Sequence, residues 1–206
     1  MTDSSTHILL IRHATTDWVG RWLAGRTPGI SLNDQGRGQA QTLAKRLAKT
    51  PLAAVYSSPL ERAQETAAAI AAPHGLPVRI DERLGEMDCG DWTGRNIEEL
   101  RQTEQWRQLH LQPGSTRFPG GESMLEAQAR MVAALDQLRA AHLATTIAIV
   151  SHADPIKAAV AYYVGLPLDL CQRLAISTAS ITELSFSPYG PRLLRCNDCA
   201  HDQPEI

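Results

Sequence analysis

The chain has 206 residues, a length that suits a single α/β domain, residues 1–206, with a substantial buried core. Its formal net charge is −2, so it lacks the strongly basic character of proteins that bind nucleic acid or acidic membranes. No apolar run approaches the roughly 20 residues needed to cross a bilayer. We therefore expect neither nucleic acid nor a membrane as a partner, and any anion site has to be a local cluster of Arg and His.

The cysteine content and the N-terminal residues indicate in which cellular compartment the protein is expected. Four cysteines are too few for a disulfide scaffold in a chain of this size, and residues 1–6 lack the features of a secretory signal. We therefore expect a cytoplasmic protein. Cys196 and Cys199 have the C-x-x-C spacing that can begin a zinc site, but no second pair follows and only His201 lies close. A reduced, incidental pair in a flexible tail from about residue 196 is expected instead.

The first predicted strand ends at residues suited to anion chemistry. Residues 8–11 form an apolar run typical of a strand buried on both faces of a parallel sheet. The run stops at Arg12 and His13, and ligands of open α/β sheets bind beyond the carboxyl ends of the strands. Arginine has a fork of donors that fits phosphate, and histidine is a nucleophile or proton carrier near neutral pH. A surface arginine beside a structural histidine is the alternative, which this stretch alone leaves open.

A loop and a helix follow. Residues 18–32 are punctuated by glycine and proline, and Asn33 is a good N-cap for a helix that reaches about Lys49. Gly36 and Gly38 weaken the start of this helix by roughly 1 kcal/mol each relative to alanine. A close backbone approach is one reason for glycine there, which the sequence leaves open.

The second predicted strand, residues 53–56, also leads into a helix. Ser58 and Glu61 have the spacing of a capping box, with Pro59 at the first helical position. Arg62 therefore lies in the first turn, where free N–H groups and the helix dipole already favour anions. The alternative is a surface arginine paired with a neighbouring glutamate.

Residues 84–94 follow a short strand at 77–80 and form a loop that contains three carboxylates, three glycines and a tryptophan. Its acids, Glu86, Asp88 and Asp91, are each more often solvated charges than catalytic acids, so this stretch alone does not select one.

A helix is predicted from about Asn96 to Leu109, and the Gly- and Pro-rich residues 113–121 after it are a candidate lid. Ser123 and Glu126 form a second capping box, which starts another helix. The residues expected on the buried side of that helix are Leu125, Met131, Val132, Leu135 and Leu138.

Residues 147–150 repeat the opening pattern, because a buried strand again ends next to a histidine, His152. Asp154 and Pro155 are expected to cap a helix that ends at Gly165, and short edge strands complete the chain. A buried histidine bonded to backbone is the alternative for His152. Two strands that each end at a histidine on one sheet edge favour a shared site instead.

Six short motifs occur in order along the chain. They are R-H-A-T-T at 12–16, L-N-D-Q-G at 32–36 with Q-A at 39–40, S-S-P-L-E-R-A at 57–63 with T-A at 66–67, L-G-E-M-D-C-G-D-W-T-G at 84–94, G-G-E-S at 120–123 and V-S-H at 150–152. Each is weak alone, but the ordered set, from about residue 8 to residue 167, resembles the histidine phosphatase superfamily in its phosphoglycerate-mutase-like branch.

The resemblance implies an α/β fold, a three-layer α/β/α sandwich around a mostly parallel sheet. It also implies that a small phosphorylated metabolite is hydrolysed without metal or other cofactor, through a phosphohistidine on His13. Glu86 would protonate the leaving group and then activate water, and this role singles it out among the three acids. The residues implied to hold the phosphoryl group are Arg12, Thr16, Arg62 and His152.

Arg21, Arg26 and Arg117 lie in loops where they could meet the distal part of a substrate, although loop arginines are usually just solvated. Two departures from the family pattern are Ala14 and Ala153, which stand where the family usually has glycine. Alanine disfavours a positive φ there. A third is Val19, where mutase-like members often carry asparagine, and this weakens one expected phosphate contact.

Two further functions remain open. A phosphomutase has to shield its phosphohistidine from water, and residues 96–122 are short for the lid of the glycolytic mutases, so hydrolysis is favoured. A catalytically silent phosphate-binding protein is the other alternative. The sequence leaves a homodimer open.

Overall fold

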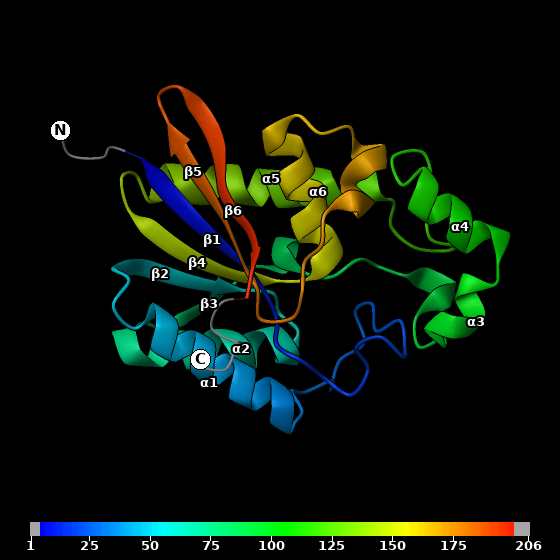
Figure 1. The fold of residues 1–206 in the computed structure, drawn as a ribbon, viewed down its shortest axis with the longest axis horizontal. Coiled ribbons are helices and arrows are strands. Elements are labelled where there is room, and N and C mark those ends of the chain that lie inside the picture. The colour runs from blue at the N-terminus through cyan, green and yellow to red at the C-terminus, as the bar shows by residue number, and fades with distance from the viewer. Residues whose placement is uncertain (1–4, 200–206) are drawn as a thin grey trace.

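The computed structural model describes residues 5–199, in which six strands form one mixed sheet of order β3-β2-β4-β1-β5-β6 (Figure 1). The strands are β1 (Thr6–Arg12), β2 (Leu52–Ser57), β3 (Val78–Ile80), β4 (Thr146–Ser151), β5 (Ile181–Ser187) and β6 (Gly190–Asp198). Strands β1 to β4 pair in parallel, whereas β5 and β6 add to the β1 edge in antiparallel fashion. The predicted α/β fold with a mostly parallel sheet is confirmed.

Helices cover both faces of this sheet (Figure 1). The α-helices of the described residues are α1 (Asp34–Leu47), α2 (Glu61–Ala71), α3 (Ile97–Arg101), α4 (Glu104–Leu111), α5 (Met124–Ala141) and α6 (Ala153–Val164). Helices α1 and α2 pack on one face and α5 and α6 on the other, which gives the three predicted layers. Helices α3 and α4 lie beyond the end of the sheet (Figure 1).

Strand β1 explains why the sheet is buried on both faces. Leu9 and Ile11 belong to the apolar cluster under α1 and α2, whereas Ile8 and Leu10 belong to the cluster under α5 and α6. Successive side chains of a strand point to opposite faces, so an unbroken apolar run fills both cores. Because both faces of the strand are buried, its polar side chains lie at its ends.

Four local predictions were wrong in detail. The helix expected over residues 96–109 is broken into α3 and α4, because the Thr103 side chain caps a new helix. Leu125 is 56% exposed rather than buried. The N-cap of α6 is His152, so Asp154 lies inside the first turn. Ser58 does not cap α2, which begins at Glu61 after an N-cap residue without a side-chain bond.

The C-terminal region also differs from expectation. Strand β6 runs to Asp198, so residues 196–198 belong to the sheet and not to a tail. Cys196 is exposed and Cys199 is half-buried, whereas His201 lies outside the described residues. No helix within residues 5–199 is long and apolar enough to span a membrane.

Gly36 and Gly38 give a matched prediction on stability. A Cβ on Gly36 would lie 2.0 Å from the carbonyl oxygen of Thr15, whereas one on Gly38 would meet nothing within 4 Å. We expect Gly36→Ala to lower the free energy of unfolding by about 1–3 kcal/mol, because backbone has to move. Gly38→Ala should raise it by about 0.5–1 kcal/mol, through helix propensity. Urea unfolding of both variants tests this, and equal effects would contradict it.

Candidate active site

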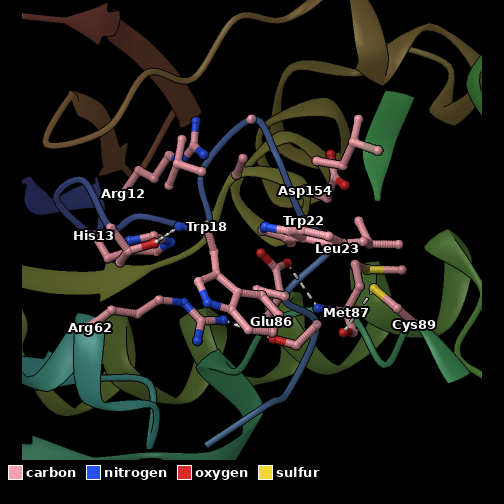
Figure 2. Close-up of a pocket in the computed structure, with 17 residues that line it drawn as sticks. Arg12, His13, Trp18, Trp22, Leu23, Arg62, Glu86, Met87, Cys89 and Asp154 are labelled. Carbon is pink, nitrogen blue, oxygen red and sulfur yellow. Dashed lines mark hydrogen bonds between the residues drawn. The ribbon is translucent and has the colours of Figure 1, made fainter. Parts of the chain in front are cut away.

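A cavity of about 150 Å³ opens beyond the carboxyl end of β1 (Figure 2). Its polar walls come from four places in the chain: the β1 end, the first turn of α2, the loop after β3 and the first turn of α6. The charged and imidazole side chains that line it are Arg12, His13, Arg62, Glu86 and Asp154. Drug-sized ligands occupy roughly 300–1,000 Å³, so this cavity suits a small molecule.

The ring of His13 is buried and its tautomer is determined by the backbone. Nδ1 lies 2.7 Å from the carbonyl oxygen of Ala14, which can only accept, so Nδ1 carries the hydrogen. Nε2 is therefore the unprotonated nitrogen. Burial, and then the charges of Arg62 and Arg12, lower the pKa of His13 to about 3. The imidazole is thus neutral and nucleophilic at physiological pH.

The alanines that replace the usual glycines cause no backbone strain. Within residues 5–199, the non-glycine residues with positive φ are Ala144, Ala179 and Asn197, so neither Ala14 nor Ala153 needs the left-handed conformation. The Ala14 N–H also donates to Thr66 Oγ1 at 3.0 Å. This bond ties the chain after β1 to helix α2.

The two arginines of the cavity are anchored on one side and unpaired on the other. Arg12 donates through Nη1 to the carbonyl of Ile176 at 2.7 Å, and Arg62 through Nη2 to the carbonyl of Gly25 at 2.8 Å. Arg12 Nε and Arg62 Nη1 are buried with no hydrogen-bond partner among residues 5–199. Buried donors are normally paired, so these atoms are available to an anion.

His152 lies behind His13, with the two ring centroids 5.1 Å apart. It is fully buried and its Nε2 makes a 2.8 Å hydrogen bond with Ser58 Oγ, which also accepts the Leu60 N–H at 3.3 Å. Its Nδ1 has no hydrogen-bond partner in the described part of the chain and lies 3.7 Å from Glu86 Oε2. Burial, followed by the charges of His13 and Arg62, keeps the pKa of His152 well below its ordinary value. It is a neutral donor or acceptor.

Glu86 is positioned as a proton donor. Its Oε1 accepts a 2.9 Å hydrogen bond from the Met87 N–H. Burial and the negative charge of Asp154 raise its pKa, against the opposing effects of that hydrogen bond and of the two arginines. A glutamate whose pKa is raised can hold a proton near neutral pH and release it to a substrate.

The remaining predicted residues divide into two groups. Thr16 is buried and lines the cavity, and Val19 and Trp22 also line it. Arg21 and Arg117 are not among its lining residues. Arg117 pairs instead with Glu126 and donates to the Gly121 carbonyl, so it contacts the N-terminal turn of α5 and the loop before it.

Arg26 is also absent from the lining, because its guanidinium is used elsewhere. Its Nε donates to the Glu86 carbonyl at 2.9 Å, and Nη2 lies 3.3 Å from Glu122 Oε2. It therefore holds the loop that carries Glu86.

Sequence reasoning missed the site role of Asp154, which it treated as a helix cap. The usable signal was its place two residues after a strand-end histidine, in the first turn of the helix. It also missed most of the apolar wall, which comprises Trp18, Leu23, Met87, Cys89 and Ile97. Met87 and Cys89 lie inside the motif at 84–94 and Trp18 follows the motif at 12–16, but no local pattern groups them with Leu23 and Ile97 into one wall.

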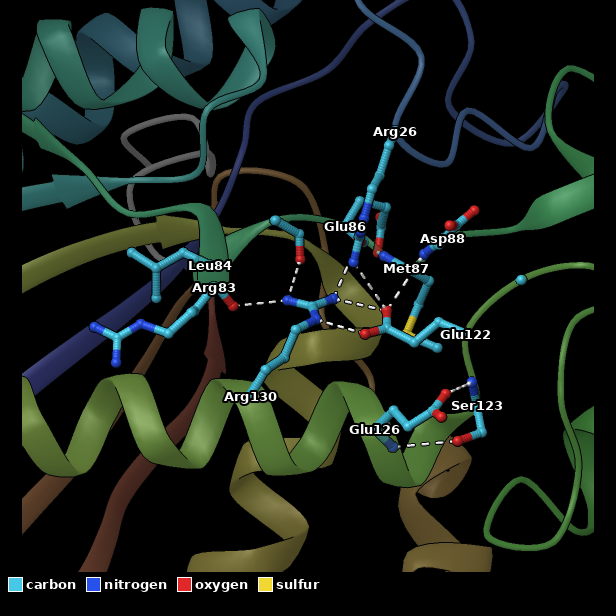
Figure 3. Close-up of polar contacts among 12 residues, drawn as sticks. Arg26, Arg83, Leu84, Glu86, Met87, Asp88, Glu122, Ser123, Glu126 and Arg130 are labelled. Carbon is cyan, nitrogen blue, oxygen red and sulfur yellow. Dashed lines mark hydrogen bonds and ion pairs between the residues drawn. The ribbon is translucent and has the colours of Figure 1, made fainter.

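Arg130 of α5 holds the Glu86 loop from below (Figure 3). Its Nη1 donates to the carbonyls of Arg83 and Gly85 at 2.7 and 2.8 Å, and its Nη2 to that of Glu86 at 3.0 Å. The same guanidinium pairs with both oxygens of Glu122, at 2.7 and 3.0 Å. The glutamate of the G-G-E-S motif thus acts through Arg130 to fix the backbone that presents Glu86.

Arg130→Met should therefore destabilise the protein and misplace Glu86. Removing one partner of a buried pair typically costs about 3–5 kcal/mol, and the Arg130 and Glu122 side chains are only 16% and 10% exposed. Arg139→Met on the same helix removes an exposed pair with Asp136 and should cost about 1 kcal/mol or less. Urea unfolding measures both, and equal costs would contradict the role given to Arg130.

Comparison with known proteins identifies the family. The family model described as "Histidine phosphatase superfamily (branch 1)" matches residues 8–199. "Phosphoserine phosphatase 1" of Hydrogenobacter thermophilus is 31% identical over 198 residues, which cover 94% of this chain and 93% of that protein. A "Probable phosphoglycerate mutase GpmB" of Yersinia enterocolitica is 32% identical over 208 residues, covering 97% and 96%.

A solved structure agrees with these relatives. The native structure of a mycobacterial glucosyl-3-phosphoglycerate phosphatase matches with a TM-score of 0.86 at 28% identity, over 94% of this chain and 99% of that one. Sequence, fold and the ordered motifs therefore lead to one conclusion: the chain belongs to the histidine phosphatase superfamily, branch 1.

Proposed function

We propose that this protein is a phosphatase that hydrolyses a small phosphomonoester through a phosphohistidine on His13. One observation carries this conclusion: three buried nitrogens have no partner in the described residues, and they belong to groups next to a neutral imidazole. Arg12 Nε and Arg62 Nη1 belong to arginines that line the cavity with His13, and His152 Nδ1 belongs to the ring 5.1 Å from His13. Such donors fit the oxygens of a phosphoryl group, and the imidazole fits its phosphorus.

The first step transfers the phosphoryl group to the enzyme. His13 Nε2 attacks phosphorus, an N–P bond forms and the bond from phosphorus to the ester oxygen breaks. Glu86 gives its proton to the departing oxygen, so the product leaves as an alcohol. The hydrogen bond from Nδ1 to the Ala14 carbonyl stabilises the positive charge that develops on the ring.

The second step regenerates the enzyme. Glu86, now a carboxylate, takes a proton from water while the water oxygen attacks phosphorus and the N–P bond breaks. Arg12, Arg62 and His152 hold the phosphoryl oxygens in both steps, and Thr16 borders the same space. If the Ser58 hydroxyl donates to His152 Nε2, Nδ1 carries the hydrogen that reaches those oxygens. Neither step uses a metal or another cofactor.

A phosphomutase is the second candidate, because a relative carries that name. It would return the phosphoryl group from His13 to bound product instead of to water. Residues 96–122 contain only the short helices α3 and α4, and of these residues only Ile97 lines the cavity. A small cover admits water more readily than a large closed lid, which favours hydrolysis.

One experiment separates these functions. The purified protein is incubated with a panel of small phosphomonoesters in EDTA, and inorganic phosphate release and 3-phosphoglycerate isomerisation are measured in parallel. Acid-labile phosphate on a His13 peptide together with phosphate release supports the phosphatase. Isomerisation without release would make it a mutase, and no turnover of any ester would support a silent phosphate-binding protein.

Location and assembly belong to the proposal as well. We propose a cytoplasmic enzyme with one domain over residues 1–206. Apolar cores on both faces of one sheet support the single domain. Light scattering after gel filtration decides between a monomer and a homodimer.

A further inference from the structure

The cavity has two chemically different sides, with Glu86 between them (Figure 2). The cationic side consists of Arg12, His13 and Arg62. The other side includes Trp22, Leu23, Met87, Cys89 and Asp154. In the proposed reaction Glu86 protonates the ester oxygen, so it marks the boundary between the phosphoryl group and the organic part of the substrate. The organic part then faces the second side.

Among residues 5–199, no Lys or Arg lies on that second side to pair with another anionic group. Arg12 and Arg62 are the only Lys or Arg residues that line the cavity within residues 5–199, and both face the phosphoryl position. Of the three loop arginines that the sequence proposed, Arg26 is bonded to the Glu86 loop and Arg117 to the N-terminal turn of α5. Arg21 does not line the cavity. A carboxylate on the substrate would therefore be desolvated without a partner.

The second side also contains a negative charge of its own. The contacts of Asp154 with Lys157 and Gln172, at 3.3 and 3.2 Å, both use Oδ1, so Oδ2 takes part in neither. Burial alone would raise the pKa of Asp154, but Lys157 and Gln172 outweigh burial and keep that pKa below its ordinary value. Asp154 is therefore ionised at neutral pH. Neither Lys157 nor Gln172 lines the cavity.

We propose that Asp154 is a specificity residue that excludes phosphomonoesters with a second anionic group, so that the substrate has an apolar organic part that is neutral or cationic. This inference rests on the proposed phosphatase function. Repulsion between like charges in a poorly solvated site disfavours the wrong substrate, while Trp18, Trp22 and Leu23 provide apolar contact for the right one. An ammonium would instead pair with Asp154 and lie near indole rings.

A matched three-carbon series tests the inference. The substrates are n-propyl phosphate, 3-aminopropyl phosphate and 3-phosphonooxypropanoate, which differ at the far end of the chain in charge. For the wild type we expect kcat/KM for the carboxylate to lie at least about tenfold below that for n-propyl phosphate. The ammonium ester should equal or exceed the neutral one. A carboxylate ester that is hydrolysed as well as n-propyl phosphate would overturn the inference and leave the phosphatase function intact.

The Asp154→Asn variant tests whether Asp154 causes the discrimination against the carboxylate ester. The ratio of kcat/KM between the neutral and carboxylate esters should fall to within about threefold, mainly because KM for the carboxylate falls. Loss of the Asp154 charge also affects Glu86, but that effect applies equally to all three esters, so the ratio isolates specificity. A uniform loss with an unchanged ratio would show a structural role and overturn the inference.

Glu98→Gln is the matched control. It removes one negative charge beside Ile97, which lines the cavity, but the Glu98 side chain is 71% exposed and paired with Arg101. In this variant the ratio of kcat/KM between the neutral and carboxylate esters should equal that of the wild type. A ratio that changed as much as in Asp154→Asn would show that the discrimination does not come from Asp154. If the wild type releases phosphate from none of these esters nor from 4-nitrophenyl phosphate, the phosphatase function itself fails.

Discussion

His13→Ala should lower turnover of every phosphomonoester by roughly 10⁴-fold or more, because alanine removes the only atom that bonds to phosphorus. Phosphate binding should survive, since Arg12, Arg62 and His152 are anchored by Ile176, Gly25 and Ser58 and not by the His13 ring. Acid-labile phosphate on the protein should disappear. Steady-state kinetics, phosphate titration by calorimetry and phosphopeptide analysis measure the three effects.

His74→Ala is the control for His13, because His74 lies in the turn after α2 and does not line the cavity. Its turnover should remain within about twofold of the wild type. Turnover by His13→Ala close to the wild-type rate would mean that phosphoryl transfer does not pass through this imidazole.

Glu86→Gln should slow hydrolysis of alkyl phosphates by roughly 10²–10⁴-fold, the usual contribution of a general acid or base. The amide can neither protonate the departing alkoxide nor take a proton from water. With 4-nitrophenyl phosphate the departing phenolate needs no proton, so the variant should transfer the phosphoryl group to His13 at nearly the wild-type rate. Hydrolysis of the phosphohistidine should still be slow, because that step needs a base. Phosphohistidine should then accumulate, and a burst of nitrophenolate measured by stopped flow would report it.

The pH profile gives an independent test of Glu86. His13 needs to be neutral, and its pKa of about 3 leaves it unprotonated throughout the neutral range. Glu86 needs to be protonated, so kcat/KM for an alkyl phosphate should fall as pH rises through its pKa. Because burial and Asp154 raise that pKa, the fall should occur at higher pH than an ordinary glutamate would give. Glu86→Gln should lose this alkaline decline.

Asp91→Asn is the control for Glu86, because Asp91 lies in the same loop but does not line the cavity. Its rates and its pH profile should match those of the wild type. An unchanged alkaline decline in Glu86→Gln would show that another group supplies the proton.

Local sequence patterns were sufficient for the elements and for most of the polar site. The apolar run of β1, the Asn33 cap of α1, the Ser123 capping box and the Gly165 stop of α6 all occur where the sequence predicted them. These signals are contacts within a few residues, so they act before any long-range packing. Because parallel strands end at one edge of the sheet, the order of the motifs also predicted which polar residues gather there.

Only the tertiary structure decided which side chains meet and in which protonation state. Ser58 bonds to His152 across 94 residues, and Arg26 bonds to the Glu86 carbonyl across 60, so neither role can be read from neighbours in sequence. The neutral His13, the raised pKa of Glu86 and the exposure of Asp154 to the cavity depend on burial and on charges from distant segments. Residue types and spacing determine where functional groups can lie, but desolvation and long-range contacts exist only once the chain is folded.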